Sequence, residues 1–135
     1  LAAELLGIAQ ESFDRTLQYM KERKQFGALI GSFQALQHRT AHWWSEIEMC
    51  KSVVLKVLQS LDEGDVKAPA LASIAKAKLC EVAELSTNEA IQLHGGIGMT
   101  DEYEIGFFIK RARPAQMLFG DYNYHANRFA LISGY

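Results

Sequence analysis

Apolar residues recur every three or four positions along most of this chain, which is the spacing that places side chains on one face of an α-helix. The pattern predicts a first helix that ends near residues 24–27, a second over residues 32–61 and a third over residues 67–94. The expected apolar faces are Leu6, Ala9, Phe13, Leu17 and Met20 on the first helix, Leu36, Trp43, Ile47, Val54, Val57 and Leu61 on the second, and Ala72, Ala75, Leu79, Val82, Ala90 and Leu93 on the third.

The last third of the chain predicts two shorter helices. Thr100 resembles an N-cap, and the acidic residues after it suit a helix N-terminus, so a helix is expected from there to Arg113. Pro114 should break that helix, and a last helix should end near residue 132. No segment alternates with period two, as a strand would. The predicted fold class is therefore all-α, an antiparallel helical bundle of the four-helix up-and-down type formed as one domain by residues 1–135.

Composition narrows the function classes. The chain has 135 residues, 49% of them hydrophobic, and a net charge of −2, so nothing indicates a nucleic-acid surface. No apolar run approaches the roughly 18 residues that a membrane span needs, and we expect a cytoplasmic protein. Cys50 and Cys80 are too few for a disulfide framework and are expected to be buried thiols. The chain begins without Met and already inside a helical pattern, so we expect a fragment of a longer protein.

A metal site in the bundle is weighed and set aside. His38, His42 and Glu46 follow one another at spacings of four and would line up on one helix face. The di-iron carboxylate bundles use a Glu-x-x-His pair on each of two helices, and no such pair occurs in this chain. A solvated polar face is the simpler interpretation, and no metal is predicted.

Two adjacent tryptophans, Trp43 and Trp44, cannot both face the core of one helix. We expect one to be buried. The other is a candidate for a subunit contact, because tryptophan is enriched at protein interfaces.

Two segments at predicted helix ends carry the candidate chemistry. Residues 23–27 close the first helix, and residues 92–100 place three glycines within four positions after the third. The glycine cluster is not the dinucleotide fingerprint, since it follows a helix and not a strand. The two segments together nevertheless suit an anionic, aromatic ligand such as a dinucleotide. The groups concerned are the guanidinium of Arg23, the ring of Phe26, the amide of Gln92, and the backbone N–H groups of Gly95 and Gly96.

Residues that match one enzyme family are spread over nearly the whole chain, in the family's order and with similar spacing, and fit least well from Pro114 onward. They resemble the C-terminal helical domain of the acyl-CoA dehydrogenase family. The matching positions are Tyr19, residues 23–27, Ile30, Phe33, Gln34, Gln37, Ala75, Lys76, residues 92–98, Glu102, Tyr103 and Arg111.

The resemblance implies a cofactor and an assembly. Enzymes of this family have an N-terminal helical domain, a middle β domain and a C-terminal bundle. FAD lies between the last two, its adenosine end reaches a neighbouring subunit, and the subunits form dimers or tetramers. By position, the residues implied along the adenosine and diphosphate of FAD are Arg23, Gln25, Phe26, Ile30, Phe33, Gln92, Gly95 and Gly96, and those implied near the flavin are Asp121 and Asn123.

The resemblance also implies a reaction, the α,β-desaturation of an acyl-CoA thioester, with electrons passed to an electron-transfer flavoprotein. In the family a carboxylate base removes the α proton, and it is usually the Glu of a loop that reads roughly Tyr-Glu-Gly-Thr. Here Phe119 stands at that position and cannot accept a proton, and Asp121 replaces the Thr. The catalytic residue is therefore unknown from the sequence.

Four explanations stay open. The base is a Glu just upstream of Leu1, as in members that place it on the first helix of this domain. It comes from the partner subunit of a heteromeric enzyme, as in some bacterial members. Asp121 acts as base from a shifted loop. Finally, the chain belongs to an inactive homologue.

The first functional hypothesis is an FAD-dependent acyl-CoA dehydrogenase, bacterial and oligomeric, whose C-terminal domain this chain forms and which is inactive as an isolated domain. The alternative is a non-catalytic subunit that completes the FAD pocket of a partner. A third class, a plain helical scaffold, gives no reason for Gln92 and the glycine cluster. In a scaffold, Gln92→Ala and Gly96→Ala should leave ligand binding unchanged.

Overall fold

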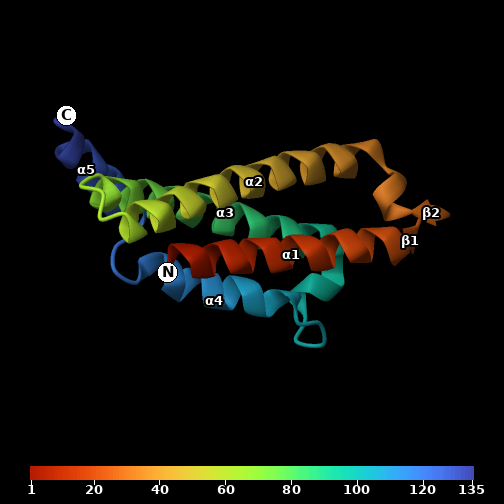
Figure 1. Cartoon of the computed structure of the whole chain (residues 1–135). Helices are drawn as coiled ribbons and strands as arrows, with labels where there is room; N and C mark the ends of the chain where they lie inside the picture. Colours follow the sequence, from red (N-terminus) through yellow and green to blue (C-terminus); the bar gives the residue numbers. More distant parts are fainter.

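Four helices run up and down along a common axis in the computed structural model, which describes residues 1–135 (Figure 1). Consecutive helices are antiparallel, so the predicted all-α bundle is confirmed. A fifth helix packs against the third at the end of the bundle opposite the hairpin. The elements are α1 (Ala2–Glu22), β1 (Lys24–Gln25), β2 (Ala28–Leu29), the 3₁₀ turn η1 (Ile30–Ser32), α2 (Gln34–Asp62), α3 (Ala68–His94), the 3₁₀ turn η2 (Gly95–Met99), α4 (Ile105–Met117) and α5 (Tyr122–Ser133).

The core surrounds α3, which contacts each of the other four α-helices. Most of the predicted apolar faces are buried there, including Phe13, Ile47 and Leu79. The end of α2 is an exception, because Leu61 is 58% exposed. α2 has 29 residues and α1 has 21, and the C-terminal end of α2 extends past the start of α1, so its last turn lacks that partner (Figure 1).

The tryptophan pair divides as expected. Trp43 is fully buried, donates its Nε1–H to Ser86 Oγ at 2.7 Å, and meets the Phe13 ring edge-on with centroids 5.0 Å apart. Trp44, the next residue, is 51% exposed. That Trp44 lies in a subunit contact remains a prediction.

A two-stranded antiparallel hairpin follows α1, and the periodicity did not predict it. Lys24 pairs with Leu29 and Gln25 with Ala28. Each strand has only two residues, which is too short for alternation to be visible in the sequence.

The start of α4 was predicted wrongly. Thr100 does not cap it. Its Oγ1 donates to the carbonyl of Ile97 at 2.8 Å and closes η2 instead, and α4 begins only at Ile105.

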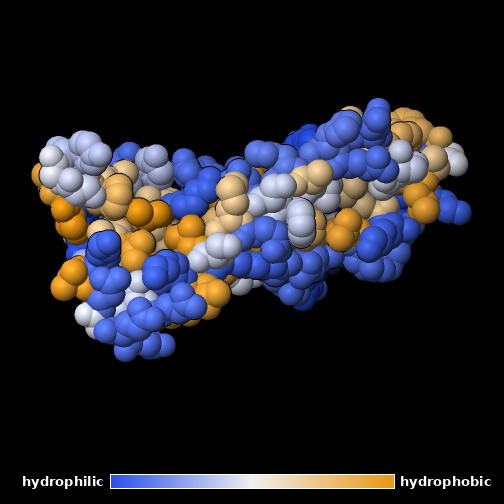
Figure 2. Space-filling view, turned by 45° about the horizontal axis from the view of Figure 1, so that its top comes forward, coloured by the Kyte–Doolittle hydropathy of each residue, from blue (hydrophilic) through white to orange (hydrophobic).

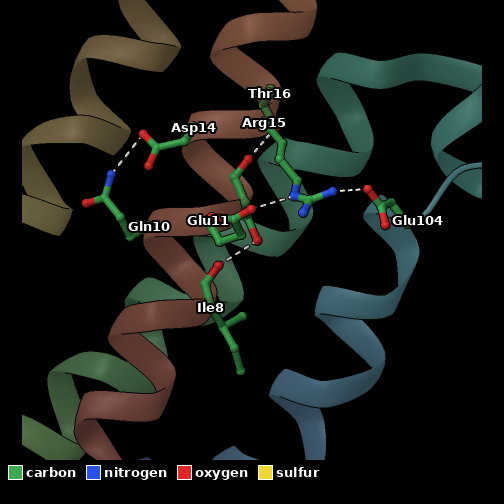
Figure 3. Close-up of polar contacts among 8 residues, drawn as sticks. Ile8, Gln10, Glu11, Asp14, Arg15, Thr16 and Glu104 are labelled. Carbon is green, nitrogen blue, oxygen red and sulfur yellow. Dashed lines mark hydrogen bonds and ion pairs between the residues drawn. The ribbon is translucent and has the colours of Figure 1, made fainter.

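The residue just before α4 is held by an ion pair with α1. Arg15 of α1 donates its Nε–H to Glu11 at 2.7 Å and also forms an ion pair with Glu104, the residue before α4 (Figure 3). The beginning of α4 is thus held by a residue 89 positions earlier in the chain, which a local cap signal cannot reveal.

Pro114 lies inside α4 and does not break it, in contrast to the prediction. The proline falls in the last turn, where the loss of one backbone hydrogen bond is limited to the helix end. The turn is stabilised by burial of Ala115 and by the Gln116 side chain, whose Nε2 donates to the carbonyl of Cys80 at 2.6 Å. Tertiary contacts therefore carry the helix on to Met117.

Gly31 marks a close approach between η1 and the end of α1. A Cβ built on Gly31 would lie 2.8 Å from the backbone oxygen of Met20, which cannot move aside as a side chain would. We expect Gly31→Ala to lower the free energy of unfolding by about 1–3 kcal/mol, as overpacking does. Urea unfolding of the chain measures it.

Gly7→Ala is the matched control. Gly7 lies in α1 with no atom within 4 Å of its built Cβ, so alanine there should stabilise by about 0.5–1 kcal/mol. Equal effects of the two substitutions would show that Gly31 is not required for packing.

None of the helices is both long and apolar enough to cross a membrane.

Candidate functional site

A groove of about 680 Å³ opens at the hairpin end of the bundle. Its walls come from the end of α1 with the hairpin and η1, from the start of α2, and from the end of α3 with η2. The structure thus brings together segments that are far apart in the sequence, with Arg23 and Gln92 separated by 69 positions. Eight of the ten predicted site residues line this groove, namely Arg23, Gln25, Phe26, Ile30, Phe33, Gln92, Gly95 and Gly96.

Arg23 is positioned by the way α1 ends. Its backbone turns extended (φ −73°, ψ 128°) while its N–H still donates to the carbonyl of Tyr19 at 2.8 Å. Its own carbonyl accepts from the N–H of Ile30 at 2.8 Å, which fastens the hairpin to the helix end. The guanidinium stays exposed at the groove, where it suits an anionic ligand.

Phe26 forms the tip of the hairpin together with Gly27. Both have positive φ, 54° and 78°, as the two central residues of a type I′ turn require. Positive φ is unusual for a bulky residue, and the Phe26 ring is 93% exposed, with only the edge of Phe33 nearby at 6.4 Å between centroids. A strained backbone that presents an uncovered aromatic ring favours a contact with another molecule.

Gly95, Gly96 and Gly98 differ in why glycine stands at each position. Gly95 has φ 67° and ψ −143°, a backbone conformation that essentially only glycine adopts. At Gly98 a Cβ would lie 2.9 Å from the backbone oxygen of Ile91. Gly96 has neither a positive φ nor any atom within 4 Å of a built Cβ, so the fold itself does not require glycine there. The open space at Gly96 lies on the groove.

Two aromatic residues that line the groove have no role in the sequence-based site. The rings of Tyr19 and His94 stack with centroids 4.2 Å apart, and His94 is only 4% exposed. Burial lowers the pKa of His94 against the opposing effect of its hydrogen bond to the Ala90 carbonyl at 2.7 Å. Because a carbonyl oxygen only accepts, the Nδ1–H of His94 is the donor in this bond.

Arg39 is a second cation on the groove that sequence reasoning missed. Its Nε and Nη2 donate to the two carboxylate oxygens of Glu89 at 2.8 and 2.9 Å, and this pairing raises the pKa of Arg39. Arg39 lies one turn after Leu36, and Glu89 one turn before Gln92, but this ordinary helical spacing does not mark either residue as part of a site. The bidentate pair holds the guanidinium in one orientation beside the groove.

The remaining two predicted site residues lie at the other end of the bundle, beside α5 (Figure 1). Asp121 caps α5, with its Oδ1 accepting from the N–H of Tyr124 at 2.9 Å. Asn123 is exposed in the first turn of that helix. Phe119, in the loop before it, has φ 60° and is 79% exposed.

The helix face of His38, His42 and Glu46, which was considered for metal binding, contacts α3 through an ion pair. Glu46 forms an ion pair with Lys78 at 2.6 Å, and no group of three His, Cys, Asp or Glu residues is placed to hold a metal ion. Cys50 and Cys80 are buried free thiols, as predicted, and burial raises the pKa of Cys50 to about 11.

The space-filling surface shows apolar residues gathered towards both ends of the molecule, with a largely polar stretch between them (Figure 2). At the hairpin end the exposed apolar residues include Phe26 and Phe33 of the groove, and at the other end Leu118 and Phe119 of the α4–α5 loop.

Comparison with known proteins gives a consistent result. Residues 1–131 match the family described as acyl-CoA dehydrogenase, C-terminal domain. The chain is 35% identical over 130 residues to the mitochondrial short/branched chain specific acyl-CoA dehydrogenase of Bos taurus, covering 96% of this chain and 30% of the relative. It superposes on butyryl-CoA dehydrogenase from Megasphaera elsdenii with a TM-score of 0.93 and 30% identity, covering 98% of this chain and 34% of that one. The structure described as the FAD complex of PigA gives a TM-score of 0.92 and 28% identity, covering 99% and 35%. The chain therefore spans about a third of the length of these proteins.

Proposed function

This chain belongs to the acyl-CoA dehydrogenase family, and from that premise we propose that it forms the C-terminal helical part of an FAD-dependent acyl-CoA dehydrogenase. The observation that carries the proposal is the groove, where Arg23, Phe26, Gln92 and Gly96 meet from separate helix ends. The relatives are enzymes by name, which does not favour a non-catalytic subunit or a plain scaffold.

The groove has the chemistry that an adenine dinucleotide needs. Arg23 supplies positive charge for a diphosphate, and the open backbone at Gly96 leaves room for its close approach. The exposed ring of Phe26 offers a flat apolar surface for an aromatic base. These residues fit the adenosine diphosphate end of FAD, the cofactor present in the structural relative described as an FAD complex.

The groove and the α4–α5 loop lie at opposite ends of α1, whose 21 residues span about 30 Å. We therefore assign them to two FAD molecules. The groove takes the adenosine diphosphate end of an FAD held by a neighbouring subunit, and Asp121 and Asn123 lie near the flavin of another. This arrangement requires a dimer or tetramer, with identical or different subunits.

The chemistry of the complete enzyme is proposed as α,β-desaturation of an acyl-CoA thioester, in which bound FAD accepts the hydride. This chain contributes binding and orientation of the cofactor. Phe119 cannot accept the α proton, and Asp121 is engaged as the N-cap of α5. We infer that the base comes from outside residues 1–135, either from the same protein upstream of Leu1 or from a partner subunit. An electron-transfer flavoprotein is the proposed electron acceptor, and the cytoplasm the proposed location.

The complete protein, purified alone, tests this function. We expect yellow protein, and we expect anaerobic titration with a panel of acyl-CoA thioesters to bleach the flavin absorbance once the base is present. Bleaching by the protein alone places the base in the same chain, whereas bleaching only after a second subunit is added places it in the partner. Protein that never binds flavin, with or without a partner, would contradict the proposal.

Phe119→Glu in the complete protein checks the location of the base. We expect turnover to stay low or the substrate preference to change, because the base already lies elsewhere. A strong rise in turnover with the same substrates would show that position 119 is the base position in this enzyme after all.

A further inference from the structure

Lys76 of α3 is a buried charged residue, only 5% exposed, that takes part in no ion pair. Its Nζ donates to the carbonyls of Gln116 at 2.8 Å and Gly120 at 2.7 Å, and lies 3.6 Å from Cys80 Sγ. A buried ammonium is costly unless each N–H has an acceptor, and here all three do. Two of these acceptors are backbone carbonyls, one in the last turn of α4 and one within the α4–α5 loop.

The loop itself is in a conformation that needs support. Phe119 has φ 60° and Gly120 φ 106°, two successive residues in the left-handed region. Such backbone persists where surrounding contacts over-determine it. Lys76 restrains the carbonyl of Gly120, and His125 of α5 donates from Nε2 to the carbonyl of Phe119 at 3.1 Å. The two consecutive carbonyls are thus held from two different helices.

The loop conformation decides where the Phe119 ring lies. Phe119 borders a second hollow, of about 330 Å³, whose walls are mainly apolar and come from the start of α1, the second half of α2 and the first half of α3. Lys76 and His125 border the same hollow. The residues that hold the loop therefore also flank the space over which it places Phe119.

We propose that Lys76 is a positioning residue, whose ammonium fixes the α4–α5 loop so that Phe119 stays at this apolar hollow. Lys76 acts through the loop backbone and does not touch a substrate. That this also affects turnover rests on the proposed function, in which the loop faces the reacting end of the acyl group. The effect on the loop itself does not depend on that function.

Hydrogen–deuterium exchange of the complete protein measures the loop directly. In Lys76→Met the amides of Leu118 and Gly120, which donate to Pro114 and Met117 carbonyls, should exchange at least about tenfold faster, because loss of charge-assisted hydrogen bonds favours local opening. Amides in the middle of α1 and α2 should not change. Lys78→Met is the matched control, since Lys78 lies two residues along the same helix and pairs with Glu46 at its surface.

Two further variants separate a local role from a general one. Lys76→Arg retains charged donors and should restore slow exchange in part, whereas Lys76→Gln, with a neutral and shorter side chain, should behave like Lys76→Met. Unchanged loop exchange in Lys76→Met would overturn the proposal. Unfolding of the whole bundle in both neutral variants would overturn it as well, because Lys76 would then serve the fold and not the loop.

Kinetics distinguish this proposal from the proposed function. If both hold, Lys76→Met should lower kcat with unchanged flavin content, and Lys78→Met should not. Faster loop exchange with unchanged kcat would support the positioning role and contradict the placement of the loop at the reacting end of the acyl group.

Discussion

Trp43→Ala is expected to lower the free energy of unfolding by about 3–5 kcal/mol, the range for truncation of a large buried aromatic residue. Trp43 of α2 is fully buried, where it packs edge-on against Phe13 of α1 and donates a hydrogen bond to Ser86 of α3. Alanine would leave a cavity, remove the aromatic pair and strand the buried Ser86 hydroxyl, and these three losses act in the same direction. Urea or thermal unfolding of the chain measures the change.

Trp44→Ala is the control, because it removes the same number of atoms one position along the helix. Trp44 is 51% exposed and forms no hydrogen bond through its ring, so we expect a change of less than about 1 kcal/mol in the isolated chain. Similar losses in both variants would mean that Trp43 is not the centre of this core. A larger loss for Trp44→Ala in the complete oligomer than in the chain would support its place in a subunit contact.

Arg23→Met should weaken FAD binding to the complete protein by about 10- to 100-fold, the effect of losing a hydrogen bond to a charged group of about 1.5–3 kcal/mol. Arg23 is exposed at the groove and is engaged by backbone contacts alone, so its guanidinium is free to meet a diphosphate. Flavin retained on dialysis, and the FAD concentration that half-restores absorbance, report the change.

The matched control is Arg113→Met on α4, which removes an exposed arginine that pairs with Glu84 outside the groove. Gly96→Val provides an independent variant. No atom lies within 4 Å of a built Cβ at Gly96, so the fold should tolerate the side chain while the groove loses its open backbone. Unchanged flavin binding in both Arg23→Met and Gly96→Val would remove the groove from the cofactor site.

Much of the fold followed from the sequence because it rests on local periodicity. The long helices α1, α2 and α3 agree with the predicted ranges to within a few residues, since their apolar stripes repeat over about four to seven turns. The errors lie where distant contacts decide. The start of α4 is held by Arg15 of α1, and Pro114 stays helical because Gln116 binds the carbonyl of Cys80.

The site residues that could be predicted from the sequence are likewise those with local signals. The residues at helix ends, such as Arg23 and Gly95, were found because caps and turns leave signals in neighbouring positions. Arg39 and Tyr19 lie within helices, where nothing local distinguishes a groove-facing residue from any other surface residue. Only the packing of α1, α2 and α3 shows that these faces converge.

The three glycines after α3 are expected to change differently among members of this family. The fold requires glycine at position 95 because of its positive φ, and at position 98 because a side chain would meet the backbone oxygen of Ile91. Any relative that still folds should therefore keep both glycines. Gly96 has neither constraint, and under the proposed function only the ligand in the groove requires glycine there. In relatives that no longer bind the cofactor, larger residues should appear at position 96 while positions 95 and 98 stay glycine. A comparison of sequences would then show in which relatives the ligand has been lost.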